Sequence, residues 1–355
     1  MRKKTAQGVV VRGIERRAFP SAVVETGHRG GVTWREAFGR LTYESDAPAT
    51  TEDTIYDLAS LTKVIATTTA AMRAVEAGAI ALDDRVATYL RDWRGKDREA
   101  VTIADLLGHA SGLTAYLPFF RDHQGRGEFE RAICTLPLEY APRTQSIYSD
   151  LGFILLAFIL EDRGFAINSV IACLDATSPD VKAGDSSRSR LSFGVQPANR
   201  ELCAPTELDL WRGRLLQGEV HDENCWALGG VAGHAGMFGT AAAVGAFARE
   251  VLNGLLGKTT LARPETFARF MHKSSVPGSS RALGWDMMLT TSSCGTYMSP
   301  RAVGHTGFTG TSLWIDPERD LYVVFLTNRV HPSRENNRLQ PVRRDFHDAV
   351  VAEEL

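Results

Sequence analysis

The strongest constraint on how this chain folds lies in residues 60–77 (SLTKVIATTTAAMRAVEA), where nearly every side chain after Lys63 is apolar or small. A helix that is apolar on all of its faces is buried in the core of a protein. Gly78 follows at the place where glycine commonly ends a helix. The sequence therefore predicts a buried helix over residues 60–77.

Ser60 and Lys63 stand at the beginning of this helix. Three residues are close to one helical turn, so the hydroxyl and the ammonium lie on the same face and can meet. A serine hydroxyl becomes a good nucleophile when a neighbour takes its proton, and the first turn of a helix favours negative charge. The two residues are therefore a candidate catalytic pair, although the same spacing also occurs on ordinary surface helices.

The two ends of the chain read as strands. Four apolar and β-branched runs predict them: 21–26, 32–39, 310–315 and 321–327. Each pair is separated by a turn, with glycines at 28–31 and with Pro317 at 316–320. A final helix is expected from near Pro341 to the end, because proline is tolerated in the first turn of a helix.

The middle of the chain reads mainly as helix. Two further helices are predicted at 102–107, where Thr102 and Asp105 form a capping-box-like pair, and at 151–162. Residues 164–192 are more polar, with 186–190 the most loop-like piece, and are expected to form a mobile segment.

This order of elements predicts an α+β fold, in which an antiparallel sheet from the N- and C-terminal segments is flanked by helices and carries an inserted, mainly helical lobe. We expect a single domain over residues 1–355. Its α/β part covers about 15–80 and 225–355, and its helical lobe covers about 81–224. A chain of 355 residues with 44% apolar residues can bury a core of that size.

Composition argues against several classes of function. The net charge is −2 and the short basic clusters lack interleaved aromatic residues, which disfavours nucleic-acid binding. The longest apolar run, 151–160, is too short to cross a bilayer. The five cysteines are scattered without a C-x-x-C pair, and the apolar run at 9–11 is too short for a signal peptide. We therefore expect a cytoplasmic protein that does not bind membranes and has no metal or other cofactor.

Two more motifs carry polar groups next to predicted elements. Tyr148-Ser149-Asp150 precedes the apolar helix at 151–162, and residues 305–310 (HTGFTG) open the C-terminal hairpin. Glycines at the edge of a strand suggest that another group approaches the backbone closely there.

The order Ser-x-x-Lys at 60–63, Tyr-Ser-Asp at 148–150 and His-Thr-Gly at 305–307 resembles the penicillin-recognising serine hydrolases. That group includes class C β-lactamases, D-alanyl-D-alanine carboxypeptidases and β-lactamase-like esterases. Residues 106–113 (LLGHASGL) also look like the Leu-Leu-x-His-x-Ser-Gly-Leu segment of the family. The resemblance extends from about residue 19 to residue 330.

The resemblance implies catalytic roles for three residues. Ser60 would be the nucleophile, and Lys63 and Tyr148 would take its proton and return it to the leaving group. A free tyrosine titrates near pH 10, so a phenolate at pH 7 needs about 4 kcal/mol of stabilisation. One ammonium at 4 Å supplies about 4 kcal/mol at an effective dielectric constant of 20. We therefore expect contact with Lys63 to be sufficient to turn Tyr148 into a base.

The resemblance also implies an oxyanion hole and a substrate-binding edge. The backbone N–H groups of Ser60 and Phe308 would bind the oxyanion, where loss of one donor costs on the order of 3 kcal/mol. The residues implied in substrate binding are Asp150, His305, Thr306 and Gly307.

Two residues depart from the β-lactamase pattern. Asp150 stands where many family members have asparagine, and a carboxylate can accept hydrogen bonds but cannot donate them. It could instead pair with Lys63 and hold the lysine charged. His305 stands where β-lactamases have lysine and is mostly neutral at pH 7, so it would hold a substrate carboxylate less firmly. Both changes favour a neutral ester or another amide over a β-lactam.

Several other polar residues have structural or functional interpretations. His109 is expected to be a hydrogen-bonded structural histidine, whereas the glycine-rich loop 229–236 lies near the site and could bring His234 to the substrate. Residues 221–223 (HDE) with His234 match no familiar zinc spacing. The chain has no Gly-x-Ser-x-Gly, which argues against an α/β-hydrolase.

The leading hypothesis is a serine hydrolase that cleaves small esters, and β-lactams weakly or not at all, through an acyl-enzyme on Ser60. The alternative is an amidase or D,D-carboxypeptidase acting on muropeptides, because 220–239 and 327–332 resemble segments of relatives linked to muropeptide recycling. A third hypothesis is a penicillin-binding-like protein that keeps the pocket without turnover. In each case the partner is a small molecule, and the sequence leaves the oligomeric state open.

Overall fold

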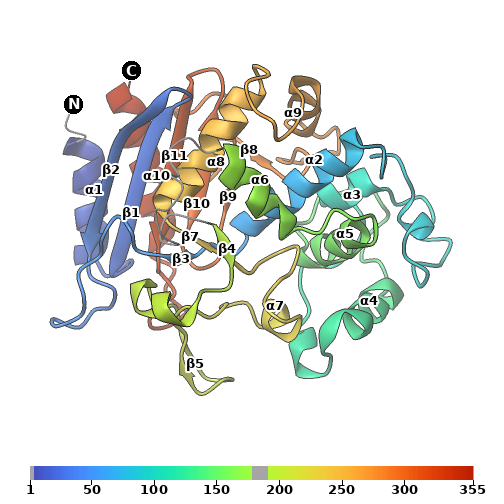
Figure 1. Ribbon diagram of the computed structural model, residues 1–355, viewed down its shortest axis with the longest axis horizontal. Coiled ribbons are helices and arrows are strands. Elements are labelled where there is room, and N and C mark those ends of the chain that lie inside the picture. The colour runs from blue at the N-terminus through green and yellow to red at the C-terminus, as the bar shows by residue number, and fades with distance from the viewer. Residues whose placement is uncertain (1–3, 178–190, 355) are drawn as a thin grey trace.

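The computed structural model describes residues 4–177 and 191–354, and its centre is a six-stranded antiparallel sheet (Figure 1). The strands lie in the order β2-β1-β11-β10-β9-β8. Their bounds are β1 Ser21–His28, β2 Gly31–Gly39, β8 Asp286–Met287, β9 Val303–Thr306, β10 Ser312–Asp316 and β11 Leu321–Thr327. The predicted sheet built from both chain ends is confirmed, and β1 pairs with β11 between Ala22 opposite Thr327 and Gly27 opposite Tyr322.

Helices cover both faces of this sheet. The helices are α1 Lys4–Glu15, α2 Thr69–Glu76, α3 Ile103–Leu107, α4 Gly125–Thr135, α5 Asp150–Asp162, α6 Ser169–Thr177, α7 Glu223–Ala227, α8 Ala241–Gly254, α9 Pro264–Phe270 and α10 Leu339–Glu354. Figure 1 shows α1 and α10 together on one side of the sheet and α8 on the other. The remaining short strands are β3 Tyr56–Asp57, β4 Ser192–Phe193, β5 Leu208–Asp209, β6 Arg214–Leu215 and β7 Met237–Gly239.

Two apolar clusters hold these layers together. The smaller one packs α1 and α10 onto the outer face of the sheet, with Phe19, Phe325 and Phe346 among its buried members. The larger one joins the inner face to α8 and to the helices between the two halves of the sheet. An α+β fold with a helical insertion is therefore what the structure contains, whereas the expected lobe boundaries at 81 and 224 stay a prediction.

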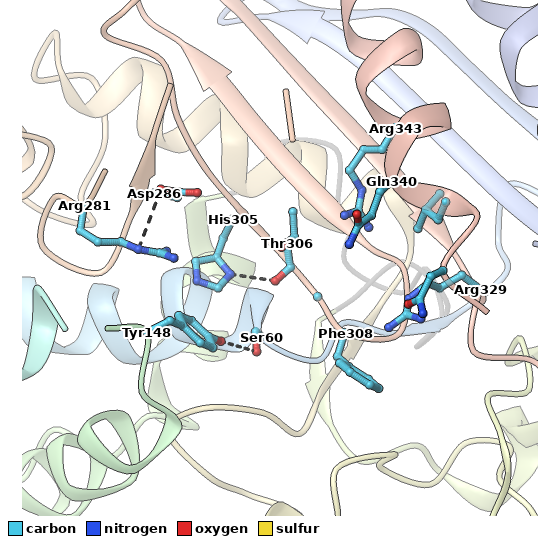
Figure 2. A pocket seen from close by; sticks show the side chains of 13 residues that line it. Ser60, Tyr148, Arg281, Asp286, His305, Thr306, Phe308, Arg329, Gln340 and Arg343 are labelled. Atoms are coloured by element: carbon cyan, nitrogen blue, oxygen red, sulfur yellow. Dashed lines mark hydrogen bonds and ion pairs between the residues drawn. The ribbon is translucent and has the colours of Figure 1, made fainter. Parts of the chain in front are cut away.

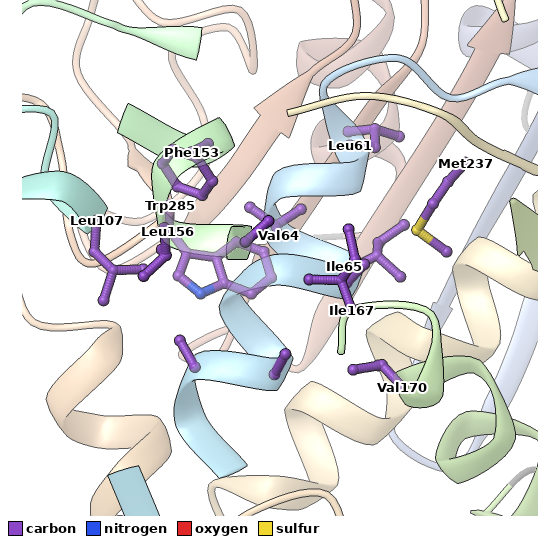
Figure 3. Close-up of a cluster of buried hydrophobic side chains, with 14 of the residues drawn as sticks. Leu61, Val64, Ile65, Leu107, Phe153, Leu156, Ile167, Val170, Met237 and Trp285 are labelled. Atoms are coloured by element: carbon purple, nitrogen blue, oxygen red, sulfur yellow. The ribbon is translucent and has the colours of Figure 1, made fainter. Parts of the chain in front are cut away.

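The helix that follows Ser60 lies at the centre of the larger cluster, as predicted (Figure 3). Leu61, Val64 and Ile65 are fully buried there, against side chains of α5 such as Phe153 and Leu156. Gly78 has a φ of 69° just beyond the end of α2, in the left-handed region that favours glycine. The sequence did not predict that residues Lys63–Thr68 form a π-helical stretch, a rare geometry that often marks functional sites.

Other segments differ from the sequence-based expectations. Helix α1 was not predicted, although residues 6, 9, 10 and 13 lie on one buried face. The segment 164–192 was expected to be mobile. Part of it forms α6, because Val170 and Leu174 join the larger core cluster. Residues 186–190, expected to be most loop-like, lie outside the described residues. Within the described part of the chain, no helix is both long and apolar enough to span a membrane.

Candidate active site

Ser60 occupies the turn between β3 and the buried helix. The residue before it, Ala59, has a φ of 45°, a left-handed conformation that costs a non-glycine residue about 1–2 kcal/mol. Two contacts hold that conformation: the backbone N–H of Ala59 donates to Asp57 Oδ1 at 2.8 Å, and Thr62 Oγ1 donates to the Ala59 carbonyl at 2.6 Å. These two hydrogen bonds therefore fix the strained backbone from which Ser60 projects.

Lys63 is fully buried and directs its ammonium at Ser60. Its Nζ donates to Ser60 Oγ at 3.0 Å, to Asp150 Oδ1 at 2.6 Å and to the carbonyl oxygen of His234 at 3.0 Å. These three acceptors match the three donors of an ammonium. Asp150 thus takes the second of the two roles open to it from the sequence, because it pairs with Lys63 at the first residue of α5.

Tyr148 reaches Ser60 from the loop before α5. Its hydroxyl donates to Ser60 Oγ at 2.7 Å. The loop is fixed by Ser149, whose N–H donates to His109 Nδ1 at 3.1 Å and whose hydroxyl donates to the Thr114 carbonyl at 2.6 Å. The His109 ring lies 4.8 Å from the Tyr148 ring, centroid to centroid. His109 is therefore a positioning residue behind the tyrosine, which agrees with the structural role expected for it.

The protonation state of Tyr148 differs from the expectation that contact with Lys63 is sufficient to make it a base. Burial raises the pKa of Tyr148, and the nearby Asp150 carboxylate raises it further, so that the lowering by Lys63 does not prevail. Burial alone would lower the pKa of Lys63, but the Asp150 carboxylate that accepts its hydrogen bond raises it above its ordinary value. The resting site therefore holds a neutral phenol and a charged ammonium, both donating to Ser60 Oγ. Contact with Lys63 is not sufficient to make Tyr148 a phenolate in the unliganded protein.

His305 lies on β9 beside the tyrosine, with 5.7 Å between the ring centroids. Its Nδ1 donates to the carbonyl oxygen of Thr306 at 2.9 Å, so Nε2 carries the lone pair. Burial, together with the charges of Arg281 and Lys63, holds the pKa of His305 well below its usual range. The neutral imidazole expected from the sequence is therefore favoured by its surroundings.

The end of β9 brings the backbone of residues 307–308 against that of the Ser60 turn. A Cβ on Gly307 would lie 2.6 Å from the Leu58 carbonyl oxygen, so the close approach needs glycine. Among the hydrogen bonds of the described residues, none uses the N–H of Ser60 or the N–H of Phe308. Both residues line one cavity, and two such free donors are what an oxyanion hole requires.

That cavity has a volume of about 510 Å³ and opens above Ser60. Its lining includes four predicted residues besides Ser60 and Phe308: Tyr148, His305, Thr306 and Gly307. Asp150 is not among the lining residues and faces Lys63 instead. The structure therefore brings most of the predicted site residues together around one space (Figure 2).

His234 enters the site only through its backbone. Its carbonyl accepts from Lys63, whereas its side chain is 1% exposed and bonds Asp222 Oδ1 at 2.8 Å. His221 bonds Glu207 at 2.9 Å instead of joining them. In the described part of the chain, no three His, Cys, Asp or Glu side chains gather as metal ligands would.

Comparison with known proteins agrees with this geometry. The family model "Beta-lactamase" matches residues 6–347. The chain belongs to the Beta-lactamase family. A provisionally named D-alanyl-D-alanine carboxypeptidase of Escherichia coli strain K12 is 32% identical to it in a match that covers 82% of this chain and 73% of the relative.

Solved structures extend the likeness of this β-lactamase-family chain at the level of the fold. EstCE1, a hydrolase with promiscuous acyltransferase activity, matches with a TM-score of 0.74 and 22% identity over 98% of both chains. Simvastatin synthase LovD of Aspergillus terreus matches with a TM-score of 0.74 and 19% identity, covering 98% of this chain and 97% of LovD. This serine hydrolase thus shares its fold with both of these proteins.

Sequence reasoning missed the arginines of the site. Arg281, Arg329 and Arg343 line the cavity together with Asp286, Asn337, Leu339 and Gln340. For Arg343 a signal was present, because it lies four residues after Leu339 and three before Phe346 on the buried face of an amphipathic helix. A charged residue on such a face is rarely buried without a reason.

Proposed function

We propose that this protein cleaves small esters through a covalent acyl-enzyme on Ser60. The observation that carries the proposal is that Ser60 Oγ lies 2.7 Å from the Tyr148 hydroxyl and 3.0 Å from Lys63 Nζ, at the floor of the cavity. A nucleophile and a proton-transfer partner within hydrogen-bond reach are what acyl transfer needs.

In the proposed acylation step, Ser60 Oγ attacks the carbonyl carbon of the ester and its proton passes to the oxygen of Tyr148. The phenol of Tyr148 is protonated at rest, so it must release its own proton as it receives the proton of Ser60. The oxygen of the leaving alcohol takes the proton that Tyr148 releases. The N–H groups of Ser60 and Phe308 bind the oxyanion of the tetrahedral intermediate.

In the second step, water attacks the acyl-serine ester by the same route in reverse. Water gives its proton to Tyr148, the carboxylic acid leaves, and Ser60 regains a proton. Lys63 remains charged throughout in this scheme, because its ion pair with the Asp150 carboxylate raises the pKa of the ammonium. The ammonium stabilises negative charge that develops on the oxygen of Ser60 or of Tyr148. Lys63 therefore contributes as a fixed cation and Tyr148 as the group that moves protons.

A second function is favoured by one specific observation. The Arg281 guanidinium lines the cavity and lies 5.2 Å from the centre of the Tyr148 ring, so a substrate carboxylate could bind beside the reacting centre despite the neutral His305. Together with the Escherichia coli relative, this supports a D,D-carboxypeptidase acting on a peptide that ends in D-alanyl-D-alanine. The released D-alanine would carry that carboxylate.

The test compares a neutral nitrophenyl ester with a peptide ending in D-alanyl-D-alanine, in the wild type, Ser60→Ala and Ser45→Ala. Ser45 is an exposed serine and controls for loss of a hydroxyl. We expect Ser60→Ala to lose turnover of either substrate by at least about 10³-fold and Ser45→Ala to keep it. Equal turnover by the wild type and Ser60→Ala would refute the proposal, and release of D-alanine would decide for the carboxypeptidase.

A labelling experiment separates turnover from binding. If a fluorophosphonate labels Ser60 and neither substrate is turned over, the protein would be a binding protein that keeps the pocket. The cytoplasmic location expected from the sequence stays a prediction.

A further inference from the structure

The two N–H groups assigned to the oxyanion belong to segments that are far apart in the sequence. Ser60 follows β3, whereas Phe308 stands in the turn after β9, and both line the cavity (Figure 2). An oxyanion is stabilised fully only if both donors lie at hydrogen-bond distance from the same point. The contacts that join these two loops therefore determine how well the site can bind a tetrahedral intermediate.

Asp57 is a buried acid at the base of the Ser60 turn. Its side chain is 3% exposed, and both of its oxygens accept hydrogen bonds from backbone N–H groups. Oδ1 accepts from Ala59 at 2.8 Å and Oδ2 accepts from His221 at 2.7 Å, so one carboxylate joins two separate backbones. Among the described residues, no lysine or arginine forms an ion pair with it. An acid is rarely buried in this way unless it serves a purpose.

His221 extends this link to Phe308. The two rings stack with 5.6 Å between their centroids and 28° between their planes. The imidazole is held in place, because its Nε2 bonds Glu207 Oε2 at 2.9 Å and Arg334 Nε donates to the same oxygen at 2.6 Å. Through the backbone and the ring of one residue, the carboxylate of Asp57 thus reaches the loop that carries the second donor.

The same two loops are also joined directly. Thr309 Oγ1 donates to the main-chain carbonyl of Asp57 at 2.7 Å, and Thr311 Oγ1 donates to that of Leu58 at 3.1 Å. Thr309 is the residue after Phe308 and is 1% exposed, so a displacement of Asp57 would also move the second donor. Side-chain and main-chain atoms of Asp57 therefore hold the Phe308 loop by two independent routes.

We propose that Asp57 is a positioning residue that holds the N–H groups of Ser60 and Phe308 at the spacing required by the oxyanion. This inference rests on the proposed function and deepens it, because a misplacement of about 1 Å can cost a factor of about 10² in rate. The charge of Asp57 acts in the other direction, since a carboxylate near the site repels an oxyanion. Positioning and charge therefore predict opposite signs when the acid is replaced by its amide.

The test uses two variants and one matched control. Asp57→Asn keeps the shape of the side chain, but the amide nitrogen cannot accept from an N–H group, so one of the two backbone links is lost. Thr309→Val removes the bond to the Asp57 carbonyl and retains the branched shape. Asp316→Asn is the control, because Asp316 is also buried and its oxygens accept from the N–H and the hydroxyl of Ser299, outside the cavity lining.

The readouts are kcat and KM for the neutral nitrophenyl ester and the inhibition constant of an alkyl boronic acid. Boron bonds to Ser60 Oγ as the serine proton is released, which gives a tetrahedral anion with an oxygen in the place of the oxyanion. A merely structural loss lowers the number of folded molecules and hence the apparent kcat, but it leaves the inhibition constant unchanged.

We expect Asp57→Asn to lower kcat about 10- to 10³-fold, with KM changed by less than about threefold, and to weaken binding of the boronic acid by a similar factor. Thr309→Val should act in the same direction by about three- to thirtyfold, whereas Asp316→Asn should leave the inhibition constant unchanged.

An unchanged inhibition constant or an increased kcat in Asp57→Asn would overturn the proposal, as would an equal effect of Asp316→Asn. If Asp57→Asn does not fold, an unchanged inhibition constant in Thr309→Val would overturn it instead. Ester turnover that depends on Ser60 would still uphold the proposed function in each of these cases. Absence of turnover and of a boronic acid adduct in the wild type would refute both.

Discussion

Buried cations are paired differently in two regions of the cavity, its floor around Ser60 and its far wall around Arg343. At the floor, Lys63 is buried with Asp150, and all three of its donors have acceptors. At the wall, Arg343 is buried beside another arginine and its Nε has no partner. A saturated ion pair holds reactive groups in position before a substrate arrives, whereas an unsaturated cation has binding capacity left for the substrate. Removing a charge should therefore have opposite consequences in the two regions.

The largest effect is expected from the smallest change at the floor, Tyr148→Phe. The variant loses the hydroxyl that donates to Ser60 Oγ and keeps the ring that packs against His109. We expect kcat/KM for a neutral ester to fall about 10²- to 10⁴-fold, with little change in melting temperature. Tyr140→Phe is a matched control, because it removes a phenol that bonds the His109 carbonyl outside the cavity lining. A loss below tenfold in Tyr148→Phe would mean that another group moves the proton.

Lys63→Met tests the paired floor through stability. It leaves the Asp150 carboxylate, whose side chain is 16% exposed, without its cation, and breaking such a pair costs about 3–5 kcal/mol of unfolding free energy. The pKa of Lys63 is raised above its ordinary value, so the contribution is complete below about pH 10 and disappears as the pH rises through the raised pKa.

Denaturant unfolding at pH 7 and again above pH 10 measures this difference. Lys258→Met, at an exposed position, should change stability by less than about 0.5 kcal/mol. A stability gap between the wild type and Lys63→Met that stays constant, or grows, at high pH would contradict the account.

Arg343→Met removes a buried cation from the far wall and should change the free energy of unfolding in the opposite direction to Lys63→Met. Methionine fills much of the same space without a buried charge and without repulsion from Arg329. We expect the free energy of unfolding to rise by about 1 kcal/mol, with Arg338→Met at an exposed position as the control. A loss of more than about 2 kcal/mol would show that Arg343 serves the fold instead of the substrate.

The smallest effect is expected in the pH dependence. The pKa of His305 lies well below its usual range and that of Tyr148 is raised, so neither group should titrate between pH 6 and 9. We expect kcat/KM for the neutral ester to change by less than about threefold across that range. A steady tenfold rise per pH unit would indicate that a phenolate, and not the resting phenol, starts the reaction.

Much of the fold could be predicted from the sequence because its strands and the central helix have strong apolar patterns. Helix α1 was missed because Val9 and Val10 were considered only as a short apolar run, although with Ala6 and Gly13 they have the spacing of a buried helical face. Helix α6 was missed because the segment 164–192 was judged as a whole, and its many polar residues predicted a mobile segment. Apolar residues at 167, 170 and 174 anchor this segment to the core.

The predicted nucleophile, amine and phenol do meet, because each stands beside an element whose packing fixes it. What could not be predicted depends on tertiary contacts. The π-helical stretch after Ser60 and the left-handed Ala59 follow from how Asp57 and Thr62 hold this turn. The state of Tyr148 depends on its degree of burial, which a sequence motif does not specify.

The most direct test of the central claim is intact-protein mass spectrometry of the enzyme mixed with a slowly hydrolysed ester. The account predicts a transient mass increase equal to one acyl group, located at Ser60 by peptide mapping and absent from Ser60→Ala. Its decay should match the steady-state turnover rate when deacylation is limiting. Acylation at another residue, or undiminished turnover by Ser60→Ala without any adduct, would contradict it.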